Sequence, residues 1–108
     1  DKAYRISEEE IENLISDRES FLISTKIVFK ENHPKFICIL EQKGLTDWEI
    51  GYCCLFTLGL KGKEVGEFIQ KKRHYIISSE IRKKLGLGEH DTNIGIWLRT
   101  LLSETENL

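Results

Sequence analysis

Apolar side chains recur every three or four positions between residues 6 and 30, which is the period of one face of an α-helix. Arg18 and Thr25 complete this stripe at the intervening turns. Its apolar members are Ile11, Leu14, Ile15, Phe21, Leu22, Val28 and Phe29. Ser7 and the three glutamates after it suit a helix start, because a hydroxyl caps free N–H groups and carboxylates favour the positive end of the helix dipole. The pattern predicts one long amphipathic helix.

Residues that start and stop helices divide the next part of the chain. Pro34 breaks the first helix and fits the first turn of a short second helix, which Gly44 ends. Thr46 and Glu49 have the spacing of a capping box, in which each side chain satisfies an exposed backbone donor of the other residue. We therefore expect a helix to begin after Thr46 and to end at Gly59.

Three further helices are predicted after Gly59. A two-turn helix covers residues 63–70, and a longer one runs from about His74 to Leu85, where Gly86 stops it. Asp91 or Thr92 caps a last helix, whose apolar residues are Ile94, Trp97, Leu98, Leu101 and Leu102. Because no useful segment alternates with period 2, the fold class is all-α.

The composition describes one globular domain. The chain has 108 residues, of which 40% are hydrophobic and 31% charged, and no apolar run is long enough for a membrane span. It begins without Met, so we expect a piece of a longer protein.

The chain has three cysteines, Cys38, Cys53 and Cys54, and the adjacent pair is a poor disulfide candidate. Cys53 and Cys54 lie in an apolar helical stretch, so we expect them to be buried as free thiols. Free thiols favour a cytoplasmic protein.

The net charge of −2 hides a basic segment. Residues 1–60 carry 7 basic and 11 acidic groups, residues 61–87 carry 8 and 3, and residues 88–108 carry 1 and 4. Basic residues gathered in one segment of an acidic chain suggest a surface that binds a polyanion. A solvated helix face is the alternative.

The helix order between Thr46 and Leu85 is that of a helix-turn-helix DNA-binding module. Residues 45–102 resemble the LuxR-type (GerE-like) domain of bacterial transcriptional regulators. Residues 45–49 (LTDWE) look like the family's L-T-x-x-E opening, Gly59-Leu60 like its turn, residues 63–66 (KEVG) like K-E-I-A, and residues 81–87 (IRKKLGL) like the end of its recognition helix. Upstream, Phe29-Lys30, residues 33–36 and residues 53–55 resemble the subset of these domains at the C-terminal end of large regulators.

The pattern of helices predicts a long helix plus a short helix over residues 1–44, which either pack on the rest of the chain or link to it. The resemblance implies a four-helix helix-turn-helix bundle over residues 45–108. A recognition helix at about 73–86 would enter the major groove of double-stranded DNA. Tyr75, Ile76 and Ser79 would contact base edges. The residues expected at phosphates are Lys61, Lys63, Lys71, Lys72, Arg73, Lys83 and Lys84. LuxR-type domains commonly dimerise through the last helix, which points to Trp97 and Leu101; the first helix is the other candidate surface for a homodimer.

Departures from the family pattern leave alternatives open. Residues 70–73 (QKKR) lack the Ser or Thr cap that usually starts the recognition helix. His74 is either a core residue with one hydrogen bond or a groove-facing, pH-sensitive residue. Ile76 either touches a thymine methyl or marks lost sequence readout. Region 4 of a sigma factor and a helix-turn-helix reused for protein interaction or dimerisation are the alternative functions.

Enzymatic chemistry is not expected. His33, His74 and His90 are far apart and have no catalytic or metal-binding spacing, and Ser78-Ser79 lacks a nucleophile-elbow context. We expect no cofactor, no metal and no small-molecule substrate. Trp48, Phe56, Phe68 and Trp97 occupy positions compatible with the core, so packing is favoured over stacking on single-stranded bases.

Overall fold

The chain is all-helical wherever it is described. The computed structural model describes the backbone of residues 8–58, 71–88 and 93–106, and the side chains of residues 17–58, 76–88 and 93–106. Within these ranges the regular elements are α1 (Glu8–Asn32), α2 (Pro34–Gln42), α3 (Asp47–Thr57), α5 (Lys71–Leu85) and α6 (Ile94–Glu106). The all-α class is confirmed. The predicted turn at Gly59-Leu60 and the helix over residues 63–70 lie outside the described residues.

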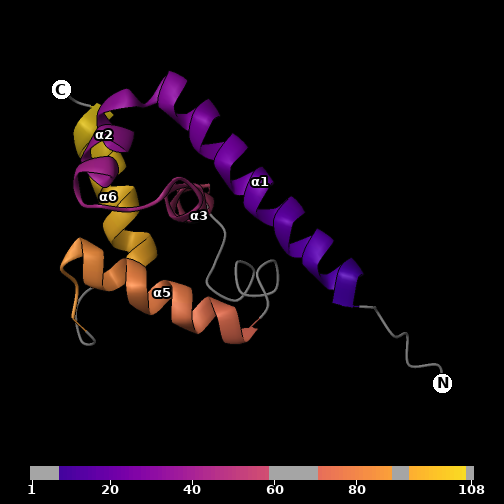
Figure 1. The fold of residues 1–108 in the computed structure, drawn as a ribbon. Helices are drawn as coiled ribbons and strands as arrows, with labels where there is room; N and C mark the ends of the chain where they lie inside the picture. The colour runs from indigo at the N-terminus through magenta and orange to yellow at the C-terminus, as the bar shows by residue number, and fades with distance from the viewer. Residues whose placement is uncertain (1–7, 59–70, 89–92, 107–108) are drawn as a thin grey trace.

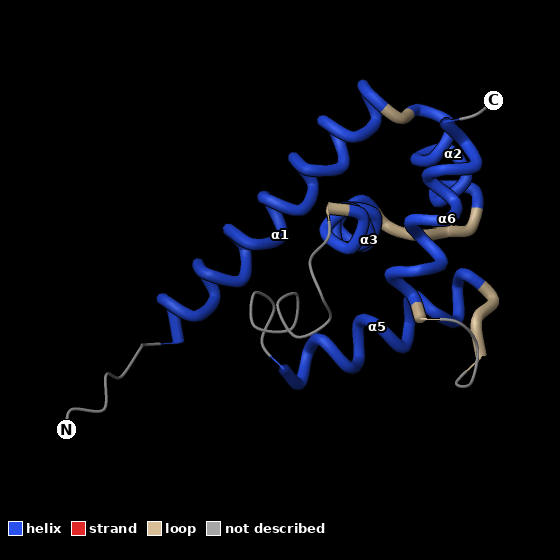
Figure 2. Tube along the Cα trace, turned by 180° about the vertical axis from the view of Figure 1, so that it is seen from behind, coloured by secondary structure: helices blue, strands red, loops and turns tan. Residues whose placement is uncertain are grey.

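α3 occupies the centre of the molecule. Figure 1 shows it nearly end-on between α1 and α6, with α2 beside α6 and α5 across the lower end of α6. Figure 2 gives the same arrangement from behind. Side chains from all five helices meet in one core, which contains Leu22, Phe36, Ile37, Leu40, Leu45, Ile50, Tyr52, Cys53, Cys54, Leu55, Phe56, Ile77, Ile81, Leu85, Ile94 and Leu98. The first 44 residues therefore share their core with the rest of the chain.

The helix stops lie where local chemistry places them. α2 begins at Pro34, and α1 ends at Asn32 just before the residue that Pro restricts. Gly44 (φ +86°) and Gly86 (φ +79°) adopt the left-handed conformation that ends a helix. After Gly86 the Leu87 N–H donates to the Arg82 carbonyl at 2.8 Å, which closes the last turn of α5.

Two helix starts differ from the expectation. α6 is capped by Asn93, whose Oδ1 accepts from the N–H groups of Gly95 (2.8 Å) and Ile96 (3.3 Å). The predicted caps, Asp91 and Thr92, lie outside the described residues. α5 begins at Lys71, three residues before the predicted start. Lysine and arginine are good helix formers, which suits a start at Lys71.

The inward face of α1 is only partly the predicted one. Leu22 is 1% exposed and Phe29 packs against the core, but Phe21 and Val28 are exposed, together with Ile23 and Ile27. The side chains of Ile11, Leu14 and Ile15 lie outside the described part. The inward face is instead completed by a charged residue, Lys26, which is buried. The placement of Phe21 and Val28 is therefore a correction to the predicted stripe.

Lys26 is buried because two carboxylates surround its ammonium group. Its Nζ lies 2.9 Å from Glu41 Oε2 on α2 and 2.7 Å from Asp47 Oδ1 at the start of α3. The hydrogen bond to Asp47 raises the pKa of Lys26 and outweighs the opposing effect of burial, so the side chain stays charged. A single lysine thus joins α1 to both neighbouring helices.

α1 and α3 cross in direct backbone contact at Gly51. A Cβ atom placed on Gly51 would lie 1.9 Å from the carbonyl oxygen of Leu22, far inside van der Waals contact. Only glycine allows the two helices to approach this closely. The crossing brings Leu22 into the core and fixes which side of α1 faces inward.

The cysteines occupy two environments. Cys53 and Cys54 are buried in α3, as the sequence predicts, and burial raises the pKa of the Cys54 thiol to about 12 and that of Cys53 well above its usual range. Cys38 is exposed on α2, where Gln42 Nε2 donates to its Sγ at 3.6 Å.

None of the helices in the described ranges is long and apolar enough to cross a membrane.

Candidate nucleic-acid interface

The outer face of α5 is set by the residues that it buries. Ile77, Ile81 and Leu85, at four-residue spacing, point into the core. Ile76 and Ser79 consequently lie on the outer side, and Ile76 is 66% exposed. Both were predicted to contact base edges; the side chain of Tyr75, the third predicted contact, lies outside the described residues.

The predicted phosphate contacts fall into three groups. Lys61 and Lys63 lie outside the described residues. Lys71, Lys72 and Arg73 form the first turn of α5, whose side chains are likewise not described. Lys83 is exposed on the outer face, and its ion pair among the described residues is a 3.5 Å contact with Glu80 one turn earlier. Positions 72, 76, 79 and 83 share one helix face, so the structure brings Ile76, Ser79 and Lys83 together.

Lys84 differs from Lys83 in its surroundings. Its Nζ donates to Glu49 Oε1 at 2.7 Å, and the Glu49 side chain is 5% exposed. The ammonium of Lys84 therefore has a buried partner within the protein. From the sequence, Glu49 is expected only in the capping box, because the contact with Lys84 spans 35 positions and has no local signal.

The capping box that holds Glu49 is confirmed. The Glu49 N–H donates to Thr46 Oγ1 at 3.3 Å, and the Thr46 N–H donates to Glu49 Oε1 at 2.8 Å. Burial acts to raise the pKa of the Glu49 carboxyl, but the hydrogen bonds from Lys84 and Thr46 and the Lys84 charge lower it more, and the net shift is downward. Glu49 is thus held in its charged form.

Acid is expected to weaken the fold through Glu49 and Glu41. The Lys26 hydrogen bond lowers the pKa of Glu41, so both folded pKa values lie below the ordinary 4.5. The stabilisation of the fold by these two ionised carboxylates is complete above that value. It is lost as pH falls below it, because the unfolded chain binds protons more readily there. The midpoint of urea unfolding, measured from pH 6 to pH 3, should fall, and should fall less steeply in Glu49→Gln. Parallel profiles for the two proteins would contradict this role of Glu49.

A hollow adjoins the exposed Ile76. It has a volume of about 300 Å³ and is lined by Trp48, Glu49, Ile76, Ile77 and Glu80. Ile76 and the half-buried Trp48 make it largely apolar, whereas Glu80 places a carboxylate on the outer part of α5. This part of α5 is less basic than the segment as a whole.

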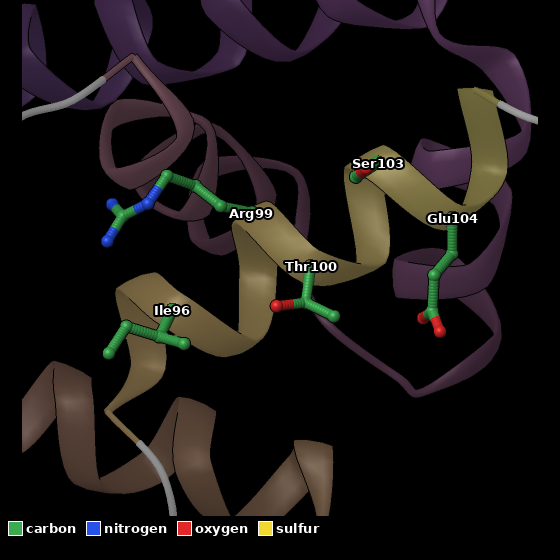
Figure 3. Close-up of a pocket in the computed structure, with 5 residues that line it drawn as sticks. All are labelled: Ile96, Arg99, Thr100, Ser103 and Glu104. Carbon is green, nitrogen blue, oxygen red and sulfur yellow. The ribbon is translucent and has the colours of Figure 1, made fainter.

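The outer face of α6 carries a second, open hollow of about 340 Å³. Figure 3 shows the residues that line it, namely Ile96, Arg99, Thr100, Ser103 and Glu104. The Arg99 guanidinium donates to the Phe56 carbonyl at 3.0 Å and so ties α6 to α3. Trp97 and Leu101, the predicted dimer contacts, are half-buried against the core of their own chain, and their role in a dimer stays a prediction.

The residues considered for catalysis do not assemble into a site in the described ranges. His33 Nδ1 pairs with Glu106 and joins the start of α2 to the end of α6. The side chains of His74 and His90 lie outside the described residues, so both readings of His74 stay open. The described residues hold no group of three His, Cys, Asp or Glu side chains that could bind a metal ion.

Comparison of the chain with protein-family models, curated proteins and solved structures finds no match. The LuxR-type resemblance therefore stays a prediction that rests on the residues quoted for it.

Proposed function

We propose that this chain binds double-stranded DNA as the C-terminal domain of a bacterial transcriptional regulator, with α5 in the major groove. The observation that carries the proposal is the outer face of α5, where Ile76, Ser79 and Lys83 are exposed within the basic segment 61–87. A 15-residue helix is about 22 Å long and narrow enough for a groove about 12 Å wide.

The residues on this face would divide the work of binding. Lys83, with the basic residues of the first turn of α5, would contact phosphates, which position the protein without reading sequence. Ser79 can hydrogen-bond a base edge, and Ile76 can contact a thymine methyl, with Tyr75 beside them along the helix. Substitutions at the lysines should therefore weaken binding to all duplexes, whereas substitutions at Ser79 should change the preference among sequences.

Two copies would bind together. One module of this size buries only about 600–1,000 Å² on DNA, so pairing across half-sites about one helical turn apart would supply selectivity. The resemblance favours the last helix as the dimer surface, and the exposed apolar residues of α1 offer the other. A complex of one chain per duplex at every half-site spacing, measured by sedimentation, would reject the dimer.

A salt titration tests the proposal. If about five phosphates are neutralised, the logarithm of duplex affinity should fall with log salt at a slope of roughly −4 to −5. Lys83→Ala should weaken binding to all duplexes and make the slope shallower by about 1, whereas Ser79→Ala should change the preference among sequences. Lys35→Ala, at an exposed position on α2 away from α5, is the matched control and should change neither.

Binding to protein is the second candidate function, and the apolar hollow beside Ile76 favours it. An isoleucine that is 66% exposed beside Trp48 suits an apolar partner side chain better than a phosphate backbone. The same titration separates the two functions: absence of duplex binding at about 50 mM salt would favour the protein partner over DNA.

A further inference from the structure

The buried carboxylate of Glu49 serves two helices at once. Its Oε1 accepts from the Thr46 N–H (2.8 Å) and the Thr46 hydroxyl (3.1 Å), both at the start of its own helix. It also accepts from the Lys84 ammonium at 2.7 Å, which comes from the last turn of α5. The Glu49 oxygen that completes the capping box of α3 is therefore also the one that binds the Lys84 ammonium of α5.

Each charge of the pair suits its own helix end. A carboxylate in the first turn of α3 lies near the positive end of that helix dipole, and a lysine in the last turn of α5 lies near the negative end of the other. Thr46 fixes the carboxylate through backbone and side-chain hydrogen bonds, so the position offered to Lys84 is rigid. This differs from the pair between Lys83 and Glu80, in which both side chains lie on the outer surface of α5.

Directional contacts are needed because the rest of the α5 interface is apolar. Ile77, Ile81 and Leu85 hold α5 against the core through burial, which is non-directional and tolerates a small rotation or slide of the helix. A hydrogen-bonded ion pair with a 5% exposed carboxylate tolerates much less displacement. The angle at which α5 presents Ile76 and Ser79 therefore depends on the pair more than on the apolar contacts.

We propose that Glu49 is a positioning residue that sets the orientation of α5 through Lys84, and that Lys84 contacts Glu49 rather than a DNA phosphate. The proposal rests on the proposed DNA-binding function for its consequence, since a misaligned α5 would present its outer face poorly to the groove. It reassigns one of the seven lysine and arginine residues that the sequence marks as phosphate contacts.

Lys84→Met and Glu49→Gln, alone and combined, test the proposal in duplex titrations over a range of salt. Each single substitution should weaken affinity by about fivefold at every salt concentration, and the double variant should lose no more than either single one, because they break the same contact. The salt slope of Lys84→Met should equal that of the unmodified protein. Lys84→Arg, which keeps the charge, should restore most of the affinity.

Lys83→Met is the matched control, because Lys83 neighbours Lys84 and its ion-pair partner in the described part of the chain, Glu80, is exposed. It should make the salt slope shallower by about 0.9 and act independently of Glu49→Gln. A shallower slope for Lys84→Met, or losses at Lys84 and Glu49 that multiply, would assign Lys84 to a phosphate and overturn the proposal. Circular dichroism should show that each variant remains helical.

Amide hydrogen exchange makes the test independent of DNA. Glu49→Gln and Lys84→Met should each speed exchange in α5 at residues 77–85 while leaving the α1 amides near Leu22 unchanged, and Lys83→Met should do neither. Unchanged exchange in α5 would overturn the positioning role. If the unmodified protein failed to bind any duplex, the proposed function would fall, whereas the exchange result would still decide whether Glu49 orients α5.

Discussion

Gly51→Ala is expected to destabilise the fold by more than about 3 kcal/mol, because the added methyl would collide with backbone rather than with a movable side chain. The methyl carbon would lie 1.9 Å from the Leu22 carbonyl oxygen. α1 must then move away from α3, which takes Leu22 out of the core and parts the Lys26 ion pairs. Urea unfolding followed by circular dichroism measures the loss, and the gain in helix propensity from alanine, about 1 kcal/mol, is too small to offset it.

Gly95→Ala is the matched control in α6. The atoms nearest to a Cβ atom there belong to side chains, with Asn93 Oδ1 at 3.1 Å and Arg99 Nη1 at 3.2 Å. These groups can shift by a few tenths of an ångström, so the change in unfolding free energy should stay within about 1 kcal/mol. If the two glycines tolerated alanine equally well, the direct crossing of α1 over α3 would be wrong.

Lys26→Glu should have the second largest effect, a loss of about 2–3 kcal/mol in unfolding free energy. The change replaces the cation that joins three helices by a third carboxylate among Glu41 and Asp47, in a position where the lysine side chain is only 11% exposed. Lys26→Met keeps the apolar stem and should lose less, because both carboxylates are partly exposed and can be hydrated.

Lys30→Glu supplies the control for Lys26→Glu. Lys30 is one helical turn further along α1, reaches Glu41 only at 3.5 Å and has a side chain that is 56% exposed. Exposed pairs contribute about 0–1 kcal/mol, so this variant should unfold near the midpoint of the unmodified protein. Raising the salt concentration should also reduce the loss of unfolding free energy in Lys26→Glu, since screening weakens the repulsion among carboxylates. Equal losses at both lysines would show that Lys26 is not the buried junction.

Local signals in the sequence account for most helix boundaries. Pro34, the Thr46–Glu49 capping box and Gly86 act within a few residues of themselves, so their effects can be read from the chain. The cap of α6 was missed by one residue because Asp91, Thr92 and Asn93 are all good caps and nothing in the sequence ranks them.

Contacts between distant residues account for what the sequence did not predict. Periodicity placed Phe21 and Val28 on one stripe with Leu22 and Phe29, but the inward side of α1 is decided by Gly51 on α3 and by the carboxylates that meet Lys26. The partner of Lys84 could not be predicted either, because the adjacent Lys83 and Lys84 look equivalent in the sequence. Only the folded chain brings Glu49 to one of them. Periodicity did predict the burial of Ile77, Ile81 and Leu85, and hence the exposure of Ile76 and Ser79, because the buried apolar residues of α5 follow a regular four-residue spacing.

Of the three thiols only that of Cys38 is exposed, so the chain can be chemically labelled at a single position. Cys53 and Cys54 are shielded inside α3 and stay protonated at neutral pH, so a maleimide dye would attach at Cys38 without any cysteine having to be removed. Cys38 lies on α2, at the opposite end of the molecule from α5 (Figure 1). A fluorophore there would report the slower tumbling of a complex while leaving the helix that we assign to DNA untouched.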